Sequence, residues 1–254
     1  MPRSSRGAAV TLVGVVALGL GLFSENAVGL PSPTLTVAAA TGMPIAGHWT
    51  TSASGADTVG WQSGQPYFLL SKNNATAAKT TFLWGDANPK RPLAGDWDGD
   101  GASEVGLFIQ ESGAFFLKKT NDAGDAADND LAAPAFSLGA GAIDARPLAG
   151  DWNGDGKDGV GIFVPADGVF FLKNDLTNGN ADITISTTHK GPSFWPIAGD
   201  WDGCGPVRPG LYDTVTGTFF LLRKRQTGAE EGAFTFTSIA GKAGIFPIAG
   251  KWDR

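Results

Sequence analysis

One sequence motif recurs along the chain and constrains its fold more than any other feature. It is clearest at residues 92–108, where Pro-Leu-Ala-Gly-Asp-Trp leads into a loop of Asp and Gly and then into Val-Gly-Leu-Phe. A second copy begins at Pro147, and shorter copies begin at Pro44, Pro196 and Pro247. The tryptophans of the five copies, at positions 49, 97, 152, 201 and 252, are 48, 55, 49 and 51 residues apart. A period of about 50 residues indicates a domain built from copies of one structural unit.

Each repeat carries four strand signals, which the second repeat shows at residues 92–97, 105–109, 114–118 and 135–138. A dipeptide ending in glycine precedes each aromatic third strand, at Gly64, Gly113, Gly168 and Gly217. Such dipeptides between apolar runs predict two-residue hairpin turns. No window has a convincing helical period. Four short antiparallel strands per repeat predict an all-β fold, a β-propeller with four blades of four strands.

The first strand of each repeat has an Ala-Gly pair followed by tryptophan. We expect this strand to lie near the propeller axis, where neighbouring blades crowd, and the tryptophan to fill the wedge between blades. The repeat count leaves one first-type strand over, at residues 247–252. In a four-bladed ring it competes with residues 44–49 for one place. Alternatively, it begins an unfinished fifth blade or pairs with another chain.

The sequence predicts a signal peptide and spacer over residues 1–43, followed by the repeat domain over residues 44–254. Two arginines precede an uncharged apolar run over residues 8–23, as in a secretory signal. That run is short for a membrane-spanning helix, which needs roughly 20 residues. The small residues 38–40 offer a cleavage site, though far from the apolar run. We therefore expect a secreted protein, or a cell-surface protein if the signal stays uncleaved, with no other membrane contact.

Charge and cysteine content exclude some partners and some sources of stability. The formal net charge is −6, and lysine and arginine form no basic stripe. The sequence therefore argues against a nucleic-acid partner, which requires such a stripe. Cys204 is the single cysteine, so no disulfide can form within the chain. Bound metal is another source of stability for an exported domain.

The loop of the second repeat has the pattern of a calcium site. Oxygen-bearing side chains stand at loop positions 1, 3, 5 and 9, with glycine at positions 4 and 6: Asp96, Asp98, Asp100 and Glu104, with Gly99 and Gly101. The carbonyl of Ala102 would add a ligand at position 7, giving the oxygen-rich shell that Ca²⁺ prefers over transition metals. Four carboxylates in one loop also repel, by about 4 kcal/mol for each close pair at an effective dielectric constant near 20. The alternative is a solvated turn rich in Asp and Gly.

The third repeat has a weaker version of this loop. Asp151, Asn153, Asp155 and Lys157 hold positions 1, 3, 5 and 7, and glycine replaces the carboxylate at position 9. Asp158 stands one position early, so a shifted loop or a water could complete a second calcium shell. In the fourth repeat Cys204 and Arg208 interrupt the pattern, and the first repeat has no acidic ladder.

Gly-Asp-Trp-Asp-Gly-Asp-Gly followed by Val-Gly-Leu-Phe resembles the calcium-loop repeat of the integrin α-chain propeller, the FG-GAP or VCBS-type repeat of many secreted bacterial proteins. The resemblance covers residues 44–252. It implies a propeller whose loops between the first two strands of a blade bind Ca²⁺ on one face. Such repeats serve adhesion, ligand binding and scaffolding, so the resemblance specifies a fold better than a function.

Three functions fit these observations. The first is a non-catalytic binding or adhesion module for a glycan or an extracellular protein. The second is a calcium-stabilised structural spacer, and the third is a glycan hydrolase or lyase. We expect no enzyme, because the only histidines, His48 and His189, stand in dissimilar contexts and no nucleophile elbow is present. Trp61, Trp84 and Trp195 lie outside the repeated Gly-x-Trp frame and are candidate sugar-binding residues, with packing between blades as the alternative.

Overall fold

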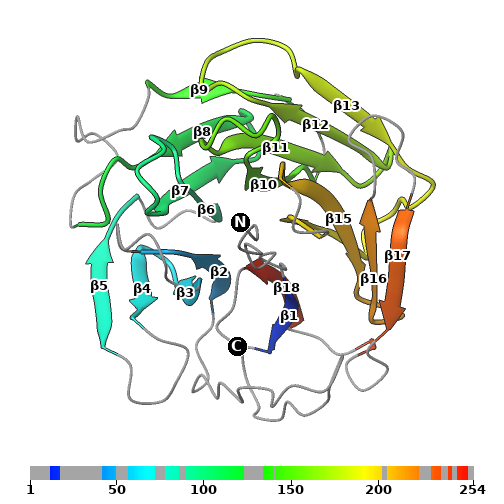
Figure 1. Ribbon diagram of the computed structural model, residues 1–254, viewed down its shortest axis with the longest axis horizontal. Coiled ribbons are helices and arrows are strands. Elements are labelled where there is room, and N and C mark those ends of the chain that lie inside the picture. The colour runs from blue at the N-terminus through cyan, green and yellow to red at the C-terminus, as the bar shows by residue number, and fades with distance from the viewer. Residues whose placement is uncertain are drawn as a thin grey trace, which may run out of the picture.

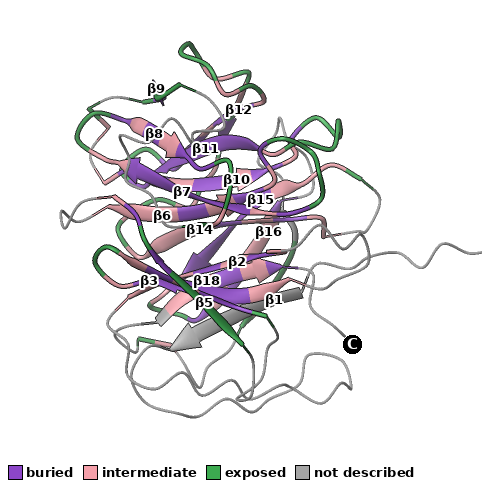
Figure 2. Cartoon of the chain, turned by 90° about the vertical axis from the view of Figure 1, so that its left-hand side faces the viewer, coloured by how far each residue is buried: buried purple, intermediate pink, exposed green. Residues whose placement is uncertain are grey.

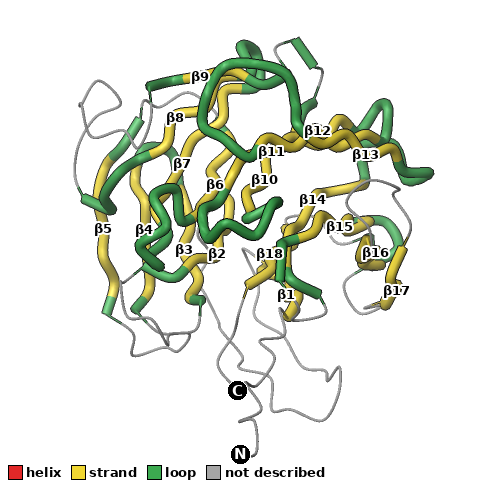
Figure 3. Tube along the Cα trace, turned by 45° about the horizontal axis from the view of Figure 1, so that its top comes forward, coloured by secondary structure: helices red, strands yellow, loops and turns green. Residues whose placement is uncertain are grey.

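The computed structural model shows four sheets, each of four antiparallel strands, arranged around an axis as the blades of a propeller (Figure 1). This confirms the predicted fold class. The structure describes residues 12–17, 42–49, 57–71, 78–85, 90–122, 134–139, 141–142, 144–201, 205–222, 230–235, 240–241 and 245–250. Figure 3 shows strands joined by loops and turns, and none of the described residues is helical. The described part of the chain therefore has no helix long and apolar enough to cross a membrane.

The blades follow the chain in order, and the strands of each blade pair in order of sequence. Blade 1 consists of β2 (Met43–Gly47), β3 (Thr58–Gln62), β4 (Pro66–Leu70) and β5 (Lys79–Leu83). Blade 2 consists of β6 (Arg91–Gly95), β7 (Glu104–Ile109), β8 (Ala114–Leu117) and β9 (Phe136–Ser137). Blade 3 consists of β10 (Arg146–Gly150), β11 (Gly159–Val164), β12 (Val169–Lys173) and β13 (Ile183–Ser186). Blade 4 consists of β14 (Phe194–Gly199), β15 (Arg208–Asp213), β16 (Thr218–Leu222) and β17 (Glu230–Thr235).

The fifth copy of the motif has its own place in the ring. Its strand, β18 (Ile245–Gly250), packs between β14 of blade 4 and β2 of blade 1. Five first strands, β2, β6, β10, β14 and β18, therefore surround the axis (Figure 1). The expected competition between the first and last copies for one place is wrong, because four complete blades leave a sector that β18 enters.

The second strand of that sector comes from the opposite end of the chain. Strand β1 (Leu12–Ala17) pairs antiparallel with β18, with Gly14 opposite Ile248. In blade 2 the glycine of Val-Gly-Leu-Phe likewise stands opposite the apolar residue of Pro-Leu-Ala-Gly, Gly106 opposite Leu93. Residues 13–16 read Val-Gly-Val-Val and so match the second strands in both sequence and register. The sequence alone placed this run outside the fold, as part of a signal peptide.

The hydrophobic core lies between blades. One cluster joins Tyr67 and Trp84 of blade 1 to Val105 of blade 2. Trp97 of blade 2 packs with Ile162 of blade 3, and the next two clusters continue the pattern through blade 4 to β18. Burial is most continuous on the second strands, such as β7 and β11, and Figure 2 shows exposure on the outer strand β5 and on loops. In blades 1 to 4 the tryptophan after Ala-Gly packs between blades, as predicted, and Trp252 of the fifth copy lies outside the described residues.

The glycine before this tryptophan is required by close packing. A Cβ atom on Gly95 would lie 2.6 Å from the Trp97 ring and 3.0 Å from the Asp158 carboxylate of blade 3. The equivalent positions in blades 1 and 3, Gly47 and Gly150, meet their own tryptophan and a residue of the next blade in the same way. The predicted crowding is confirmed, and its sources are the returning indole ring and the neighbouring blade.

The turns between second and third strands are longer than predicted. In blade 2 Ile109 pairs with Ala114, which leaves four residues in the loop rather than two. The glycines at positions 64, 113, 168 and 217 have φ values of 68, 66, 70 and 71°. Glycine adopts this left-handed conformation at little cost, and it ends the four-residue loops of blades 2 to 4. In blade 1 Gly64 is instead the second residue of the loop between Gln62 and Tyr67.

Substitution of Gly95 by alanine tests the close packing. We expect Gly95→Ala to lower the free energy of unfolding by about 1–3 kcal/mol, because the added methyl group overlaps the Trp97 ring. Urea denaturation measures the change. Gly232→Ala is the matched control, since no atom lies within 4 Å of its Cβ position and it should change stability by less than about 0.5 kcal/mol. Equal effects of the two substitutions would contradict this account of packing.

Candidate functional site

The inner strands separate two ends of the propeller. The acidic loops follow the last residue of an inner strand, whereas the residue before each repeated proline is the first or second residue of one. A five-residue strand spans roughly 17 Å, so these features lie on opposite faces. Each face carries one candidate site. The acidic loop over residues 96–104 lies at the ends of the inner strands, and a pocket on the axis lies at their starts.

Backbone amides shape the loop of blade 2 around Asp96. Its Oδ1 accepts hydrogen bonds from the N–H groups of Gly99 at 2.7 Å and Asp100 at 3.1 Å, and its Oδ2 accepts from Gly101 at 2.8 Å. The two glycines have φ values of 84° and 91°. The Asp100 carboxylate accepts from the amide of Ala102 at 2.8 Å. The loop is therefore held by carboxylate–amide hydrogen bonds.

Three of the predicted calcium ligands converge in this loop. Oxygen atoms of Asp96, Asp98 and Glu104 all lie within 4.8 Å of one another. Glu104 is buried, and burial followed by the charges of Asp98, Asp100 and Asp96 raises its pKa to about 8. Burial likewise raises the pKa of Asp96, although hydrogen bonds from Gly101 and Gly99 oppose the shift. The cluster is thus destabilised when all its carboxylates are ionised. Hard oxygen donors of this kind fit a divalent cation.

The loop of blade 3 has the same backbone hydrogen bonds and different electrostatics. Asp151 accepts from Gly154 at 2.6 Å, Asp155 at 3.1 Å and Gly156 at 2.9 Å. Asn153 donates to the Asp155 carboxylate at 2.9 Å. That bond, the Lys157 amide and the Lys157 charge lower the pKa of Asp155. Residues at 151–157 therefore reproduce the shape of the first loop without its excess negative charge.

The residue at position 8 of one blade's loop forms hydrogen bonds with position 1 of the preceding blade's loop. The Asp158 carboxylate accepts from the Asp96 amide at 2.9 Å, and its own amide donates to the Asp96 carbonyl at 2.7 Å. Ser103 pairs with His48 of blade 1 in the same way. Burial and the nearby carboxylates of Asp96, Asp151 and Asp57 raise the pKa of Asp158 to about 7. Asp158 therefore links blades 2 and 3, a role that its offset position in the third loop did not suggest.

The structure separates the three candidate sugar-binding tryptophans. Trp84 is 1% exposed within the core between blades 1 and 2, and Trp61 is 9% exposed and stacked on Phe68. Trp195 is half-buried and lines a pocket. The two histidines also lie apart: the His48 ring bonds the Gly101 carbonyl, and the His189 ring stacks on Phe220.

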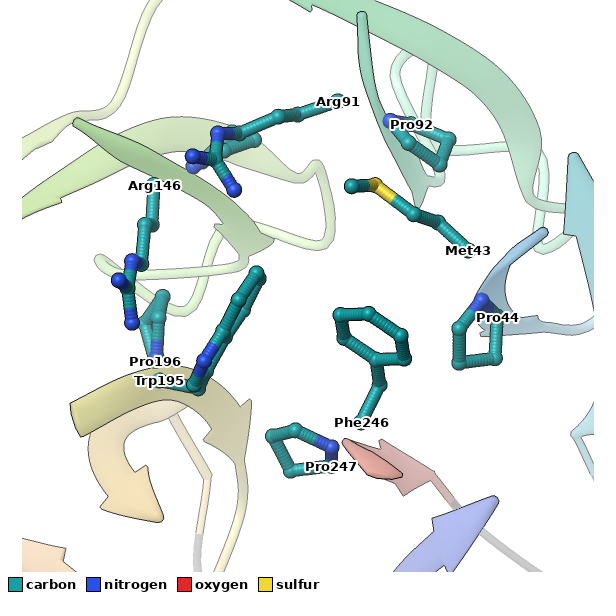
Figure 4. Close-up of a pocket in the computed structure, with 10 residues that line it drawn as sticks. Met43, Pro44, Arg91, Pro92, Arg146, Trp195, Pro196, Phe246 and Pro247 are labelled. Atoms are coloured by element: carbon teal, nitrogen blue, oxygen red, sulfur yellow. The ribbon is translucent and has the colours of Figure 1, made fainter. Parts of the chain in front are cut away.

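The pocket on the axis is built from equivalent residues of the five repeats. Its volume is about 90 Å³, and every inner strand contributes the repeated proline and the residue before it. The residues before proline are Met43, Arg91, Arg146, Trp195 and Phe246, whose side chains converge in Figure 4. Trp195 lies between Arg146, whose guanidinium is 4.2 Å from the ring centre, and Phe246, which meets it edge to face at 5.1 Å.

Asp144 holds the two arginines together. Its carboxylate accepts from Arg91 at 2.6 Å and from Arg146 at 2.5 Å. Asp144 has a φ of 55°, the one positive value at a non-glycine residue in the described segments. Aspartate tolerates that conformation better than most residues do. Burial lowers the pKa of Arg91, which the Asp144 charge opposes and the Arg146 charge reinforces.

Sequence reasoning missed the arginines, Asp144, Met43 and Phe246. The available signal was the alignment of the repeats themselves. Pro-[Ile/Leu]-Ala-Gly is constant in all five copies, whereas the residue before it varies. That residue is arginine in two copies and methionine, tryptophan or phenylalanine in the others. A variable position beside a constant strand is where a repeat fold can place a binding residue, because that residue is not needed for packing.

Comparisons with known proteins give little beyond the fold. No protein-family model matches the chain, and no curated protein matches it in sequence. Among solved structures, the chain is similar to a lectin of Agrocybe aegerita, described as recognising non-reducing terminal N-acetylglucosamine, at 10% identity and a TM-score of 0.46. The match covers 80% of this chain and 56% of the lectin chain.

The raised pKa of Glu104 predicts a pH dependence of stability when divalent cations are removed. The carboxyl ionises near 4.5 in the unfolded chain and near 8 in the folded protein. Its protonated form therefore stabilises the fold fully below pH 4.5, and this contribution is lost as the pH rises to 8. With chelator present, we expect Glu104→Gln to weaken the fall in melting temperature over this range. Asp155→Asn, in the uncrowded loop, is the control. An unchanged pH profile for Glu104→Gln would contradict the assignment.

Proposed function

We propose that this protein is a non-catalytic binding module that recognises a glycan in the axial pocket. The observation that carries the proposal is the convergence of two arginines, Trp195, Phe246 and Met43 at one position of five repeats. Sugars combine hydroxyl groups with apolar C–H faces, and pockets that bind them combine polar groups with aromatic walls. The pocket has both features.

The size of the pocket supports recognition of the end of a ligand. Its volume of about 90 Å³ is well below that of sites that enclose a whole small molecule, roughly 300–1,000 Å³. One edge of a terminal sugar fits such a volume, and the rest of a glycan would lie across the rim. The paired arginines are fixed by Asp144, so the site is largely formed before a ligand arrives.

We further propose that the loop at residues 96–104 binds Ca²⁺ and stabilises the exported protein. The support is the convergence of Asp96, Asp98 and Glu104 oxygens around an unfavourable concentration of negative charge. A divalent cation offsets that repulsion. The loop at residues 151–157 lacks a carboxylate at positions 3 and 9, and its Asp155 pKa is lowered, so the proposal is confined to blade 2. The FG-GAP or VCBS-type resemblance agrees with this role.

Calcium is expected to raise the melting temperature through the blade 2 loop alone. At a hundredfold excess over Kd, bound calcium adds about 2.7 kcal/mol of stability. Asp98→Asn should remove this increment, because it removes one of the proposed carboxylate ligands. The loop itself should keep its shape, since Asp98 is exposed and the Asp96–amide bonds stay in place. Asp155→Asn should retain the increment. Thermal unfolding with calcium or with chelator measures both, and equal wild-type melting temperatures in the two buffers would refute the site.

Binding is expected to depend on Trp195. We expect Trp195→Ala to weaken glycan binding by roughly tenfold or more, as for other aromatic anchors of binding sites. A glycan array followed by calorimetry on the best binder measures the effect. Leu83→Ala, at a side chain 57% exposed on the outermost strand of blade 1, is the control. Chelator should leave binding intact in the folded protein, because the acidic loop lies at the other end of the strands. A wild-type protein that binds no glycan would indicate a structural spacer instead.

A further inference from the structure

We infer that the axial pocket selects an acidic sugar and that Arg91 receives its carboxylate. The inference rests on the proposed function, because it names the ligand chemistry of the same pocket. Two guanidinium groups meet one carboxylate there, with Asp144 2.6 Å from Arg91 and 2.5 Å from Arg146. The three side chains together carry a net charge of +1. Because the group is partly buried, this charge attracts an anion more strongly than an exposed arginine would.

Each arginine donates three hydrogen bonds, and the two differ in where their unused N–H groups lie. The Nε of Arg146 is buried, whereas the Arg91 side chain is partly exposed at the pocket. Arg146 is 5% exposed, and its Nη1 donates to the Phe194 carbonyl at 2.6 Å. Its Nη2 donates to Asp144 and, at 2.9 Å, to the Pro192 carbonyl. Arg146 is therefore fixed to the connection between blades 3 and 4. It contributes charge and supports the Trp195 ring.

Arg91 keeps donors for a ligand. Its Nε and Nη2 donate to the side-chain oxygen of Gln110 at 3.2 and 3.1 Å, and Nη2 also donates to Asp144. The described residues provide no hydrogen-bond acceptor for Nη1, and the side chain is 18% exposed at the pocket. A guanidinium has five N–H donors, two of them on Nη1. A carboxylate that accepts from Nη1 makes a charge-assisted hydrogen bond, about twice as strong as a neutral one.

The surrounding residues distinguish an acidic sugar from other anions. Trp195, Phe246 and Met43 place apolar surface beside Arg91, which suits the C–H face of a sugar ring better than a small inorganic ion. A single surplus positive charge matches one carboxylate. A phosphate monoester carries about −1.5 to −2 charges at neutral pH and would leave negative charge in a partly buried site. Sulfated sugars share the single charge, so the test includes them.

The experiment compares sugars that differ only in the acidic group. Calorimetry would measure the affinity of the full chain for oligosaccharides ending in D-glucuronate, D-glucose or 6-sulfo-glucose. We expect the glucuronate ending to bind roughly 10- to 100-fold more tightly than the glucose ending, in line with a hydrogen bond to a charged group. Arg91→Gln should reduce that ratio to about twofold or less, because the glucuronate ending loses its guanidinium partner. Arg91→Lys, which keeps the charge without the guanidinium, should restore part of the ratio.

Two controls separate ligand binding from folding and from general charge. Lys79→Gln removes the same charge from the outer strand β5 and should leave the ratio unchanged. Competition between free glucuronate and glucose on the wild-type protein tests the selectivity without any variant.

Each outcome decides between the two proposals. Equal wild-type affinity for glucuronate and glucose endings overturns the acidic-sugar inference and leaves the proposed glycan binding intact. A preference for the sulfated ending over glucuronate, or a ratio that survives Arg91→Gln, also overturns it. Absence of binding to all three endings, and to the glycan array, overturns both.

Discussion

The packing of an indole ring onto a glycine backbone underlies the rest of this structure. In blades 1 to 3 the tryptophan that follows Ala-Gly turns back over the glycine, and a residue of the next blade lies against the same Cβ position. The glycine has no side chain to give way, so the inner strand, the wedge residue and the neighbouring blade are fixed by one contact. Repetition of this contact around the axis positions the inner strands. The starts of the inner strands then surround the pocket at one end of the axis. The loops that follow these strands lie at the other end.

This arrangement divides the repeat into positions that build the fold and positions that are available for function. The Ala-Gly pair and the tryptophan recur because they are held by packing between blades. The residue before proline lies at the pocket, where packing imposes little restriction, and it varies from Met43 to Phe246 among the five copies. A pseudo-symmetric ring thereby produces an asymmetric site, with arginines on two neighbouring strands and aromatic residues on the next two.

The sequence predicted the fold well because the fold depends on recurring local contacts. The 50-residue period, the glycine-ended turns and the wedge tryptophans all appear in the structure. The turn length was wrong, because a dipeptide shows where the chain reverses but not how many residues pair beyond it. The place of β18 was left open among three alternatives, because the number of sectors depends on the angle between blades rather than on any single repeat. Likewise, residues 12–17 are apolar and β-branched, a composition that serves an export signal and a strand equally well.

The two acidic loops show why a shared motif did not identify equivalent sites. Asp96 and Asp151 each accept backbone amides of their own loop in the same three-bond pattern, so the first carboxylate of the motif determines the shape of the turn. The later carboxylates determine its charge. In the blade 2 loop, burial and the charges of its aspartates raise the pKa of Glu104. In the blade 3 loop, Asn153 and Lys157 lower the pKa of Asp155. Because shape and charge reside in different residues, a repeat can lose an ion site and keep its loop. Blade 4 shows this separation again: Asp200 still accepts the Gly205 amide at 3.2 Å, while arginine stands where blade 2 has Glu104.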